Sequence, residues 1–119
     1  MNAKVFGTAI GIGVLAAFFY LYKAAPPGDT IDVHFTEAGY APAQLILKKG
    51  DTIKFINDSS KEFWPASNIH PTHEIYSEFD PKRALPAGDS WAFRFTRPGV
   101  WRFHDHIAPE FTGIITVQE

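Results

Sequence analysis

Four of the five histidines in the chain fall in two short clusters, His70-Pro71-Thr72-His73 and His104-Asp105-His106. Imidazole nitrogens are ligands for late divalent transition metals, so two such clusters brought together by a fold predict a metal site. The chain contains no cysteine, and its one methionine is Met1. The site therefore lacks thiolate and thioether ligands, which limits the metal chemistry that it can support.

The second cluster has the spacing of a strand. Side chains alternate between the two faces of a strand, so His104 and His106 are expected on one face, about 7 Å apart, a separation that suits one metal ion. Asp105 is expected on the other face with Trp101 and Phe103, which identify it as the core side. A buried carboxylate is costly without a partner, so Asp105 needs a histidine, a backbone donor or a metal beside it.

Each histidine also has an ordinary interpretation as a solvated or hydrogen-bonded side chain, and the metal interpretation rests on the two clusters taken together. Three imidazoles and an oxygen donor suit Cu(II), with Zn(II) as the alternative. The fifth histidine, His34, follows the polar face of the first expected strand and is interpreted as a surface residue.

The elements that position these clusters are predicted to be strands. A chain of 119 residues with 45% hydrophobic residues has room for one domain with a substantial core. Alternating or apolar runs predict seven short strands and no amphipathic helix after residue 22, which is typical of an all-β sandwich or small barrel. The expected strands cover residues 31–35, 45–47, 53–56, 73–76, 91–95, 101–104 and 113–117.

The connections follow from turn residues. Residues 48–51, Lys-Lys-Gly-Asp, make the flanking strands a hairpin or a corner, and Arg-Pro-Gly at 97–99 predicts an antiparallel hairpin with aromatic cross-strand pairs. Residues 58–71 and 77–89 are expected to be long loops, where binding residues concentrate. Within the first loop, Phe63 and Trp64 form either an exposed docking patch or a cap on the end of the barrel.

The N-terminal sequence predicts export. Residues 5–22 carry no charge and end in aromatic residues before Lys23, which is typical of a membrane helix. We expect a signal anchor over 1–23, a linker over 24–29 and a folded domain over 30–119 on the periplasmic or extracellular side. A cleaved signal peptide, which would release a secreted domain, is the alternative. The net charge of −2, with acidic and basic residues mixed, argues against nucleic-acid binding.

Residues 30–119 resemble the cupredoxins, the Greek-key β-sandwiches of blue copper proteins and multicopper oxidases. The resemblance is carried by residues 39–42 leading into 45–57, by 86–91, by 98–104 and by 113–117. The run HDHIAPE at 104–110 is similar to the oxidase pattern H-C-H-I-x-x-H, with Asp105 at the cysteine and Glu110 at the last histidine. HPTH at 70–73 is similar to H-P-x-H-x-H, with Ile75 in place of the third histidine. Without the cysteine, a type 1 blue site is excluded.

The resemblance implies copper as the cofactor and groups His73, His104 and His106 as ligands on the outward side. His70 and Glu110 are possible additional ligands, and Asp105 would orient a ligand imidazole through its other nitrogen. An inward site built from His70, Asp105 and Glu110 in the blue-copper pocket is the alternative. We favour the outward site, because three neutral imidazoles bind Cu(II) without burying two carboxylates.

The predicted function is that of an exported, membrane-anchored copper-binding protein with a sulfur-free, non-blue site. It would serve electron transfer or copper handling, with a redox or copper-delivery protein as partner. One alternative is a copper- or zinc-dependent redox enzyme with an open three-histidine site, which the absence of an evident nucleophile–base pair disfavours. Another is a metal-free interaction module. An oligomer that shares ligands across an interface is also compatible with the sequence.

Overall fold

The fold was obtained as a computed structural model, which describes residues 28–119. The expected N-terminal helix and most of the expected linker lie outside the described residues. Within the described part, no helix is long and apolar enough to span a membrane.

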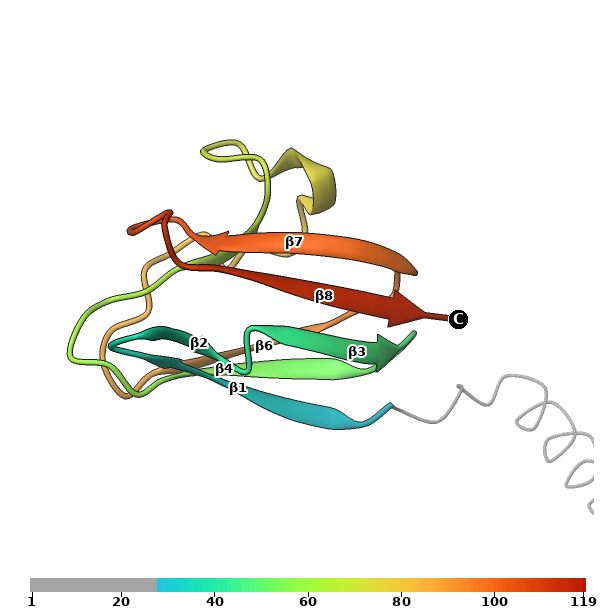
Figure 1. Ribbon diagram of the computed structural model, residues 1–119, viewed down its shortest axis with the longest axis horizontal. Helices are drawn as coiled ribbons and strands as arrows, with labels where there is room; N and C mark the ends of the chain where they lie inside the picture. Colours follow the sequence, from blue (N-terminus) through green and yellow to red (C-terminus); the bar gives the residue numbers. More distant parts are fainter. Residues whose placement is uncertain (1–27) are drawn as a thin grey trace, which may run out of the picture.

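Two four-stranded sheets pack face to face (Figure 1). One sheet has the order β2-β1-β4-β6, with β2 at Gly39–Ala41, β1 at Thr30–Thr36, β4 at Thr52–Asn57 and β6 at Ser90–Arg94. The other has the order β3-β8-β7-β5, with β3 at Gln44–Lys48, β8 at Thr112–Gln118, β7 at Gly99–Asp105 and β5 at Pro65–Ser67. The expected all-β sandwich is confirmed, with eight strands rather than seven.

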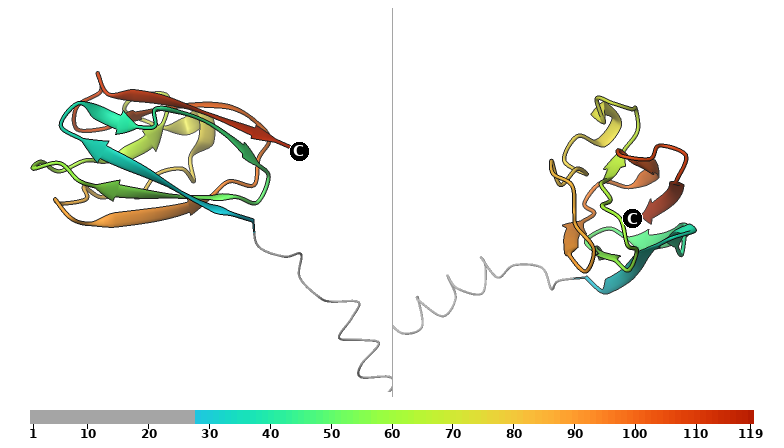
Figure 2. Two further views of the ribbon diagram at one scale, coloured as in Figure 1. Left: turned by 60° about the horizontal axis from the view of Figure 1, so that its bottom comes forward. Right: turned by 90° about the vertical axis from the view of Figure 1, so that its left-hand side faces the viewer.

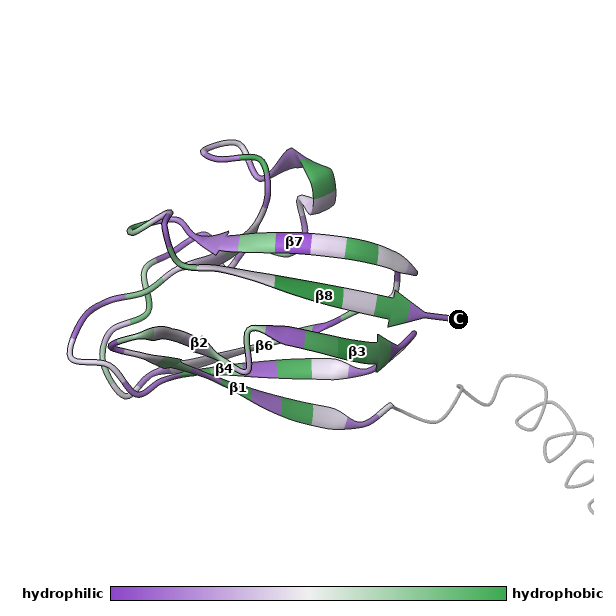
Figure 3. Cartoon of the chain, viewed as in Figure 1, coloured by the Kyte–Doolittle hydropathy of each residue, from purple (hydrophilic) through white to green (hydrophobic). Residues whose placement is uncertain are grey.

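Alternate residues of the strands meet between the sheets and form an aromatic core. Hydrophobic and hydrophilic residues alternate along β1 and β7 (Figure 3), as expected for strands with one buried face. Phe55 of β4 lies at the centre of the core, with ring contacts to Phe79, Trp91 and Phe103. Burying a large apolar side chain contributes about 1.5–3 kcal/mol, so this core makes the strands a rigid support for their ends.

The expected hairpin over residues 91–103 is wrong. β6 pairs with β4 in one sheet, whereas β7 pairs with β8 and β5 in the other, so residues 95–98 cross between the layers. The aromatic residues of the two strands are connected by a third ring instead of forming cross-strand pairs: Tyr76 packs between Phe93 and Trp101, with ring centroids 5.5 and 4.8 Å away. The β3–β4 connection is likewise a corner, because these strands belong to different sheets.

The strand expected at 73–76 is a single turn of 3₁₀-helix, η1, at Glu74–Tyr76. His73 precedes it with φ 57° and ψ 26°, in the left-handed region. Tyr76 is 2% exposed, so one aromatic anchor holds this segment on the core without a strand ladder. Strands β2 and β5, each of three residues, were not expected, because runs this short give no periodic signal.

The two ends of the sandwich differ. At one end, Asp29 near the start of β1 bonds to Asp51, and Gly50 bonds to Phe95, the residue after β6. β7 begins at this end and runs to Asp105 at the opposite end (Figures 1 and 2), a distance of about 20 Å at about 3.3 Å per residue. The start of β1 and the histidine clusters therefore lie at opposite ends.

Candidate metal centre

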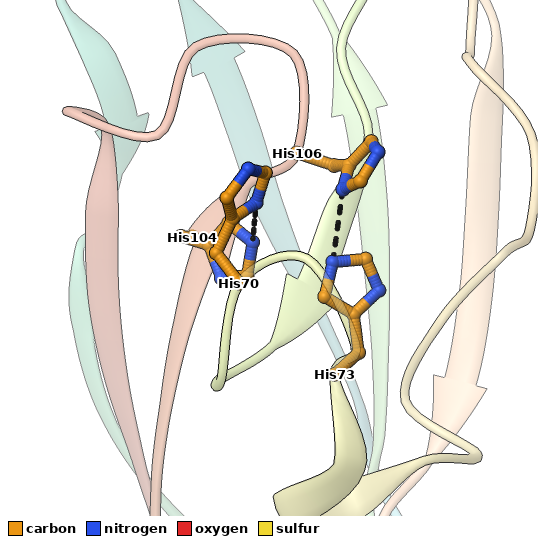
Figure 4. A group of neighbouring side chains, drawn as sticks. All are labelled: His70, His73, His104 and His106. Atoms are coloured by element: carbon orange, nitrogen blue, oxygen red, sulfur yellow. Dashed lines mark hydrogen bonds between the residues drawn. The ribbon is translucent and has the colours of Figure 1, made fainter.

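The two histidine clusters come together at one place. Ring nitrogens of His70, His73, His104 and His106 all lie within 4.8 Å of one another (Figure 4). β5 pairs with the end of β7, with Ala66 opposite His104, so the loop after β5 carries the first cluster onto the second. Among residues 28–119, these four histidines are the one group of three or more histidine, aspartate or glutamate side chains that lie close enough together to hold a metal ion.

Two nitrogen pairs are especially close. His70 Nδ1 lies 3.1 Å from His104 Nε2, and His106 Nδ1 lies 3.0 Å from His73 Nε2 (Figure 4). Metal–imidazole bonds of about 2.0 Å place neighbouring ligand nitrogens about 2.8–3.3 Å apart and opposite ligands of a square plane about 4 Å apart. The close pairs fit neighbouring ligands, and a small inward movement of the rings brings the wider separations into range.

His73 and His104 form an inner pair with fixed ring orientations. Each is 3% exposed. The Nδ1–H of His73 donates to Asp80 Oδ2 at 2.7 Å, and the Nδ1–H of His104 donates to Asn68 Oδ1 at 3.0 Å. Because both acceptors are oxygens, the inner rings carry their proton on Nδ1 and turn a free Nε2 toward the group, as a metal ligand requires.

His70 and His106 form a rim pair. His70 is exposed and His106 is half-buried, with its ring centroid 4.5 Å from that of Trp64. Within the described residues, neither rim ring has a side-chain hydrogen bond outside the group. The inner Nε2 atoms can only accept, so the rim rings donate from Nδ1 in the metal-free protein. For these Nδ1 atoms to bind a metal, the rim protons must move to Nε2.

The environment of His104 and His106 favours the neutral form of these two rings. Burial, followed by the neighbouring His73 and His70, lowers the pKa of His104 to about 4. Burial and the same two neighbours also lower the pKa of His106. At Asp80, burial acts to raise the pKa, but the hydrogen bonds from His73 and Trp64 outweigh it and lower the pKa. Neutral imidazole is the form that binds metals, so the lowered pKa values of His104 and His106 favour a ligand role for these two rings at neutral pH.

Asp105 lies apart from the four histidines, as the alternation along β7 predicts, and is 1% exposed. Of the partners left open for it, the structure shows backbone donors: its carboxylate accepts from the N–H groups of Trp64 at 2.7 Å, Ala108 at 3.2 Å and Ile107 at 3.4 Å. Burial nevertheless raises the pKa of Asp105. The carboxylate thus ties the loop after β7 to the segment before β5.

The remaining residues of interest lie outside the group. Glu110 is exposed and lines one pocket with Asp105, but His70 belongs to the histidine group instead, so the three residues of the inward alternative do not form one close group. His34 is on the surface, as expected, where it pairs with exposed Asp58. Phe63 is fully buried, so the docking patch that included it is wrong, and the residue belongs to the core.

Asn68 and Asp80 were missed by the sequence analysis. Both sit in irregular segments, and their role follows only from the contacts with His104 and His73 across the fold. A search for polar residues near a histidine cluster finds Asn68, two residues before His70. No local signal points to Asp80, which precedes Pro81 in an ordinary turn-like sequence.

No protein-family model matches the sequence, and no curated protein sequence matches it. Among solved structures, the chain is similar to a purple cupredoxin from Nitrosopumilus maritimus, with 22% identity over 73% of this chain and 98% of that one, at a TM-score of 0.64. A reduced amicyanin mutant has 21% identity over 75% and 82%, at a TM-score of 0.65. A copper-containing nitrite reductase from Thermus scotoductus has 23% identity over 82% of this chain and 24% of that one, at a TM-score of 0.63. The expected cupredoxin-like fold is thus confirmed, in a chain that has no cysteine ligand.

Proposed function

We propose that the protein binds one copper ion through His70, His73, His104 and His106 and serves in copper handling. The observation that carries the proposal is the convergence of four ring nitrogens within 4.8 Å on a cupredoxin-like fold. Two of these nitrogens are already held in the ligating orientation by Asn68 and Asp80. Such oriented imidazoles are typical of metal sites, where a hydrogen bond at one ring nitrogen fixes the other.

Copper is the metal that the donor set favours. Divalent copper binds nitrogen ligands more tightly than the other first-row metals and prefers a tetragonal arrangement. Neighbouring ring centroids around the group lie 4.8–5.0 Å apart, whereas the centroids of His70 and His73, which lie opposite each other, are 6.3 Å apart. Such a cycle of near neighbours with a longer diagonal fits a tetragonal arrangement better than a tetrahedron, in which all separations would be equal. Zinc, which favours the tetrahedron, is the competing metal. Similar solved structures include a nitrite reductase described as copper-containing and an amicyanin described in a Cu(I) form, which supports copper.

The ligand chemistry bears on the role. Copper would supply one-electron chemistry between Cu(II) and Cu(I), and soft sulfur ligands select Cu(I). The histidine group offers imidazoles and no sulfur ligand, so it favours the oxidised ion. Preference for one oxidation state suits capture and handling of Cu(II) more than rapid electron transfer, which is the second role that the site supports.

We further propose that the domain is exported and membrane-anchored by residues 1–23, with a copper-delivery or redox protein as partner. The apolar run at 5–22 supports the anchor. The histidine group lies about 20 Å from the end of the sandwich at which β1 begins, by strand length. An anchor attached before β1 would leave the copper site directed away from the membrane and open to a partner.

The test is a metal-loading competition. Purified protein is exposed to equal Cu(II) and Zn(II) in a weak chelator, and bound metal is measured by mass spectrometry. We expect one copper per chain and a nitrogen-rich paramagnetic resonance spectrum without the intense visible absorption of thiolate-bound copper. His73→Ala and His104→Ala should strongly reduce the copper bound in this competition, whereas His34→Ala, which changes the histidine outside the group, should not. Preferential zinc loading, or copper binding unaffected by both inner substitutions, would refute the proposal.

A further inference from the structure

One carboxylate serves both a candidate ligand and a neighbouring indole. Asp80 lies in the loop between η1 and β6 and is 11% exposed at its side chain. Its Oδ2 accepts from His73 Nδ1 at 2.7 Å. Its Oδ1 accepts from Trp64 Nε1 at 2.7 Å and from the backbone N–H of Lys82 at 2.8 Å. Both oxygens are therefore engaged, each by a different part of the site.

Trp64 connects Asp80 to a second candidate ligand, His106. Its ring lies against the ring of His106, with centroids 4.5 Å apart. Its backbone carbonyl also accepts from the N–H of His106 at 2.8 Å. The indole hydrogen bond to Asp80 thus fixes the surface on which the His106 imidazole rests.

We propose that Asp80 is a positioning residue for the copper site, which orients His73 directly and His106 through Trp64. This proposal rests on the proposed function. The two ligands concerned are a close pair, with His106 Nδ1 3.0 Å from His73 Nε2. A single side chain therefore sets the relative orientation of half of the site. Among the side chains of residues 28–119, Asn68 is the one outside the group that hydrogen-bonds to a ring of the other half, at His104.

The arrangement requires a carboxylate. A carboxylate accepts hydrogen bonds at both oxygens, whereas an amide accepts at one atom and donates from the other. In Asp80→Asn, the NH₂ group of the new amide must point at either the His73 N–H or the Trp64 N–H, so that two donors oppose each other. One of the two contacts is then lost, along with the negative charge that strengthens His73 as a donor.

The experiment is a double-mutant cycle with Asp80→Asn, Trp64→Phe and the two combined in the full chain. Cu(II) affinity is measured by chelator competition, and the copper environment by paramagnetic resonance. Asp80→Asn should weaken Cu(II) binding by about 10–100-fold and change the copper hyperfine splitting. Trp64→Phe should cause a smaller loss. The double variant should lose less affinity than the product of the two single fold-losses. The reason is that phenylalanine has no N–H, so the amide oxygen of Asn at position 80 is free to accept from His73.

The matched control is Asp58→Asn, since Asp58 also pairs with a histidine, His34, outside the group. It should leave affinity and spectrum unchanged. In the metal-free protein, the indole N–H resonance of Trp64 should shift in Asp80→Asn and not in Asp58→Asn, which tests the contact without copper.

The outcomes separate the two proposals. Failure of the unsubstituted chain to bind copper overturns the proposed function. Copper binding that is equal in Asp80→Asn and Asp58→Asn overturns the role of Asp80. If Asp80→Asn does not fold, Trp64→Phe provides the test. A paramagnetic resonance spectrum of copper-loaded Trp64→Phe that is identical to that of the unsubstituted protein would overturn the role of Asp80 in orienting His106 through Trp64.

Discussion

The inner and rim pairs of the histidine group use the same side chain in different settings. His73 and His104 are 3% exposed, and each has a hydrogen-bonded oxygen behind its ring. His70 is exposed and His106 is half-buried, and in the described part of the chain their ring hydrogen bonds stay within the group. The comparison shows that the fold prepares two ligands fully and leaves two adjustable.

This difference has energetic consequences for metal binding. Fixing a mobile side chain costs conformational entropy, and the buried inner rings have already lost that freedom on folding. The inner rings also hold the ligating tautomer, whereas the rim rings must move a proton from Nδ1 to Nε2. Copper should therefore gain most of its affinity from the inner pair and should enter and leave past the rim.

The largest expected effect comes from truncating the inner pair. His73→Ala or His104→Ala should reduce Cu(II) affinity by about 10²–10³-fold, taking a structural metal site of about 10–16 kcal/mol as divided among its ligands. The loss is large because a prepared donor disappears and its oxygen partner is left unpaired. Chelator-competition titrations measure it, and His34→Ala is the control. A loss below tenfold for both variants would remove the distinction between the pairs.

The second prediction concerns pH and the metal-free protein. The pKa of His104 is about 4 in the folded state, below the ordinary value of 6.5. Between about pH 4 and pH 6.5 the unfolded chain therefore binds a proton at this residue that the folded chain does not bind. Stability should therefore be full above about pH 6.5 and fall as the pH drops toward 4, by up to about 3 kcal/mol. Urea unfolding from pH 7 to 4 measures this.

His104→Gln should reduce the dependence of the unfolding free energy on pH, whereas His34→Ala should leave this dependence unchanged. A His104 ring that titrates near pH 6.5 in a nuclear magnetic resonance experiment would contradict the prediction.

Truncating the exposed rim ligand should have a smaller effect. His70→Ala should retain one copper per chain with affinity lowered about tenfold, since the inner pair and His106 remain. Added imidazole should occupy the vacated position and restore the resonance spectrum, because the site there is open to solvent. Loss of all binding would show that the rim contributes as much as the inner pair.

The smallest effect is expected at Asn68. Asn68→Ala removes the acceptor behind His104 and should weaken Cu(II) binding several-fold. This lies below the about 10–100-fold typical of such partners, because Asn68 is half-buried and water can replace its neutral oxygen. The comparison with Asp80→Asn in the same titration separates a neutral partner from a charged one.

The sequence predicts correctly those parts of the molecule in which apolar and polar residues alternate with the period of a strand. The alternation along β7 placed Asp105 opposite the histidines, and apolar alternation gave the sandwich. Prediction from the sequence failed where tertiary packing decides. Aromatic residues of β6 and β7 meet through Tyr76 rather than as the cross-strand pairs of a hairpin, and Tyr76 holds its own segment as a 3₁₀ turn. Asp80 meets His73 only after the chain folds, so spacing carried no signal for it.

The carboxylate of Asp105 also determines what a thiol at the same position would cost the domain. A thiol placed at position 105 would leave the backbone N–H groups of Trp64 and Ala108 without their acceptor, at a cost of about 1–3 kcal/mol for each buried group. Introducing a cysteine would thus loosen the segments that carry the histidines without supplying the rest of a new ligand set. A thiolate-ligated site at this end of the sandwich would therefore require new acceptors for both loops together with the substitution at position 105.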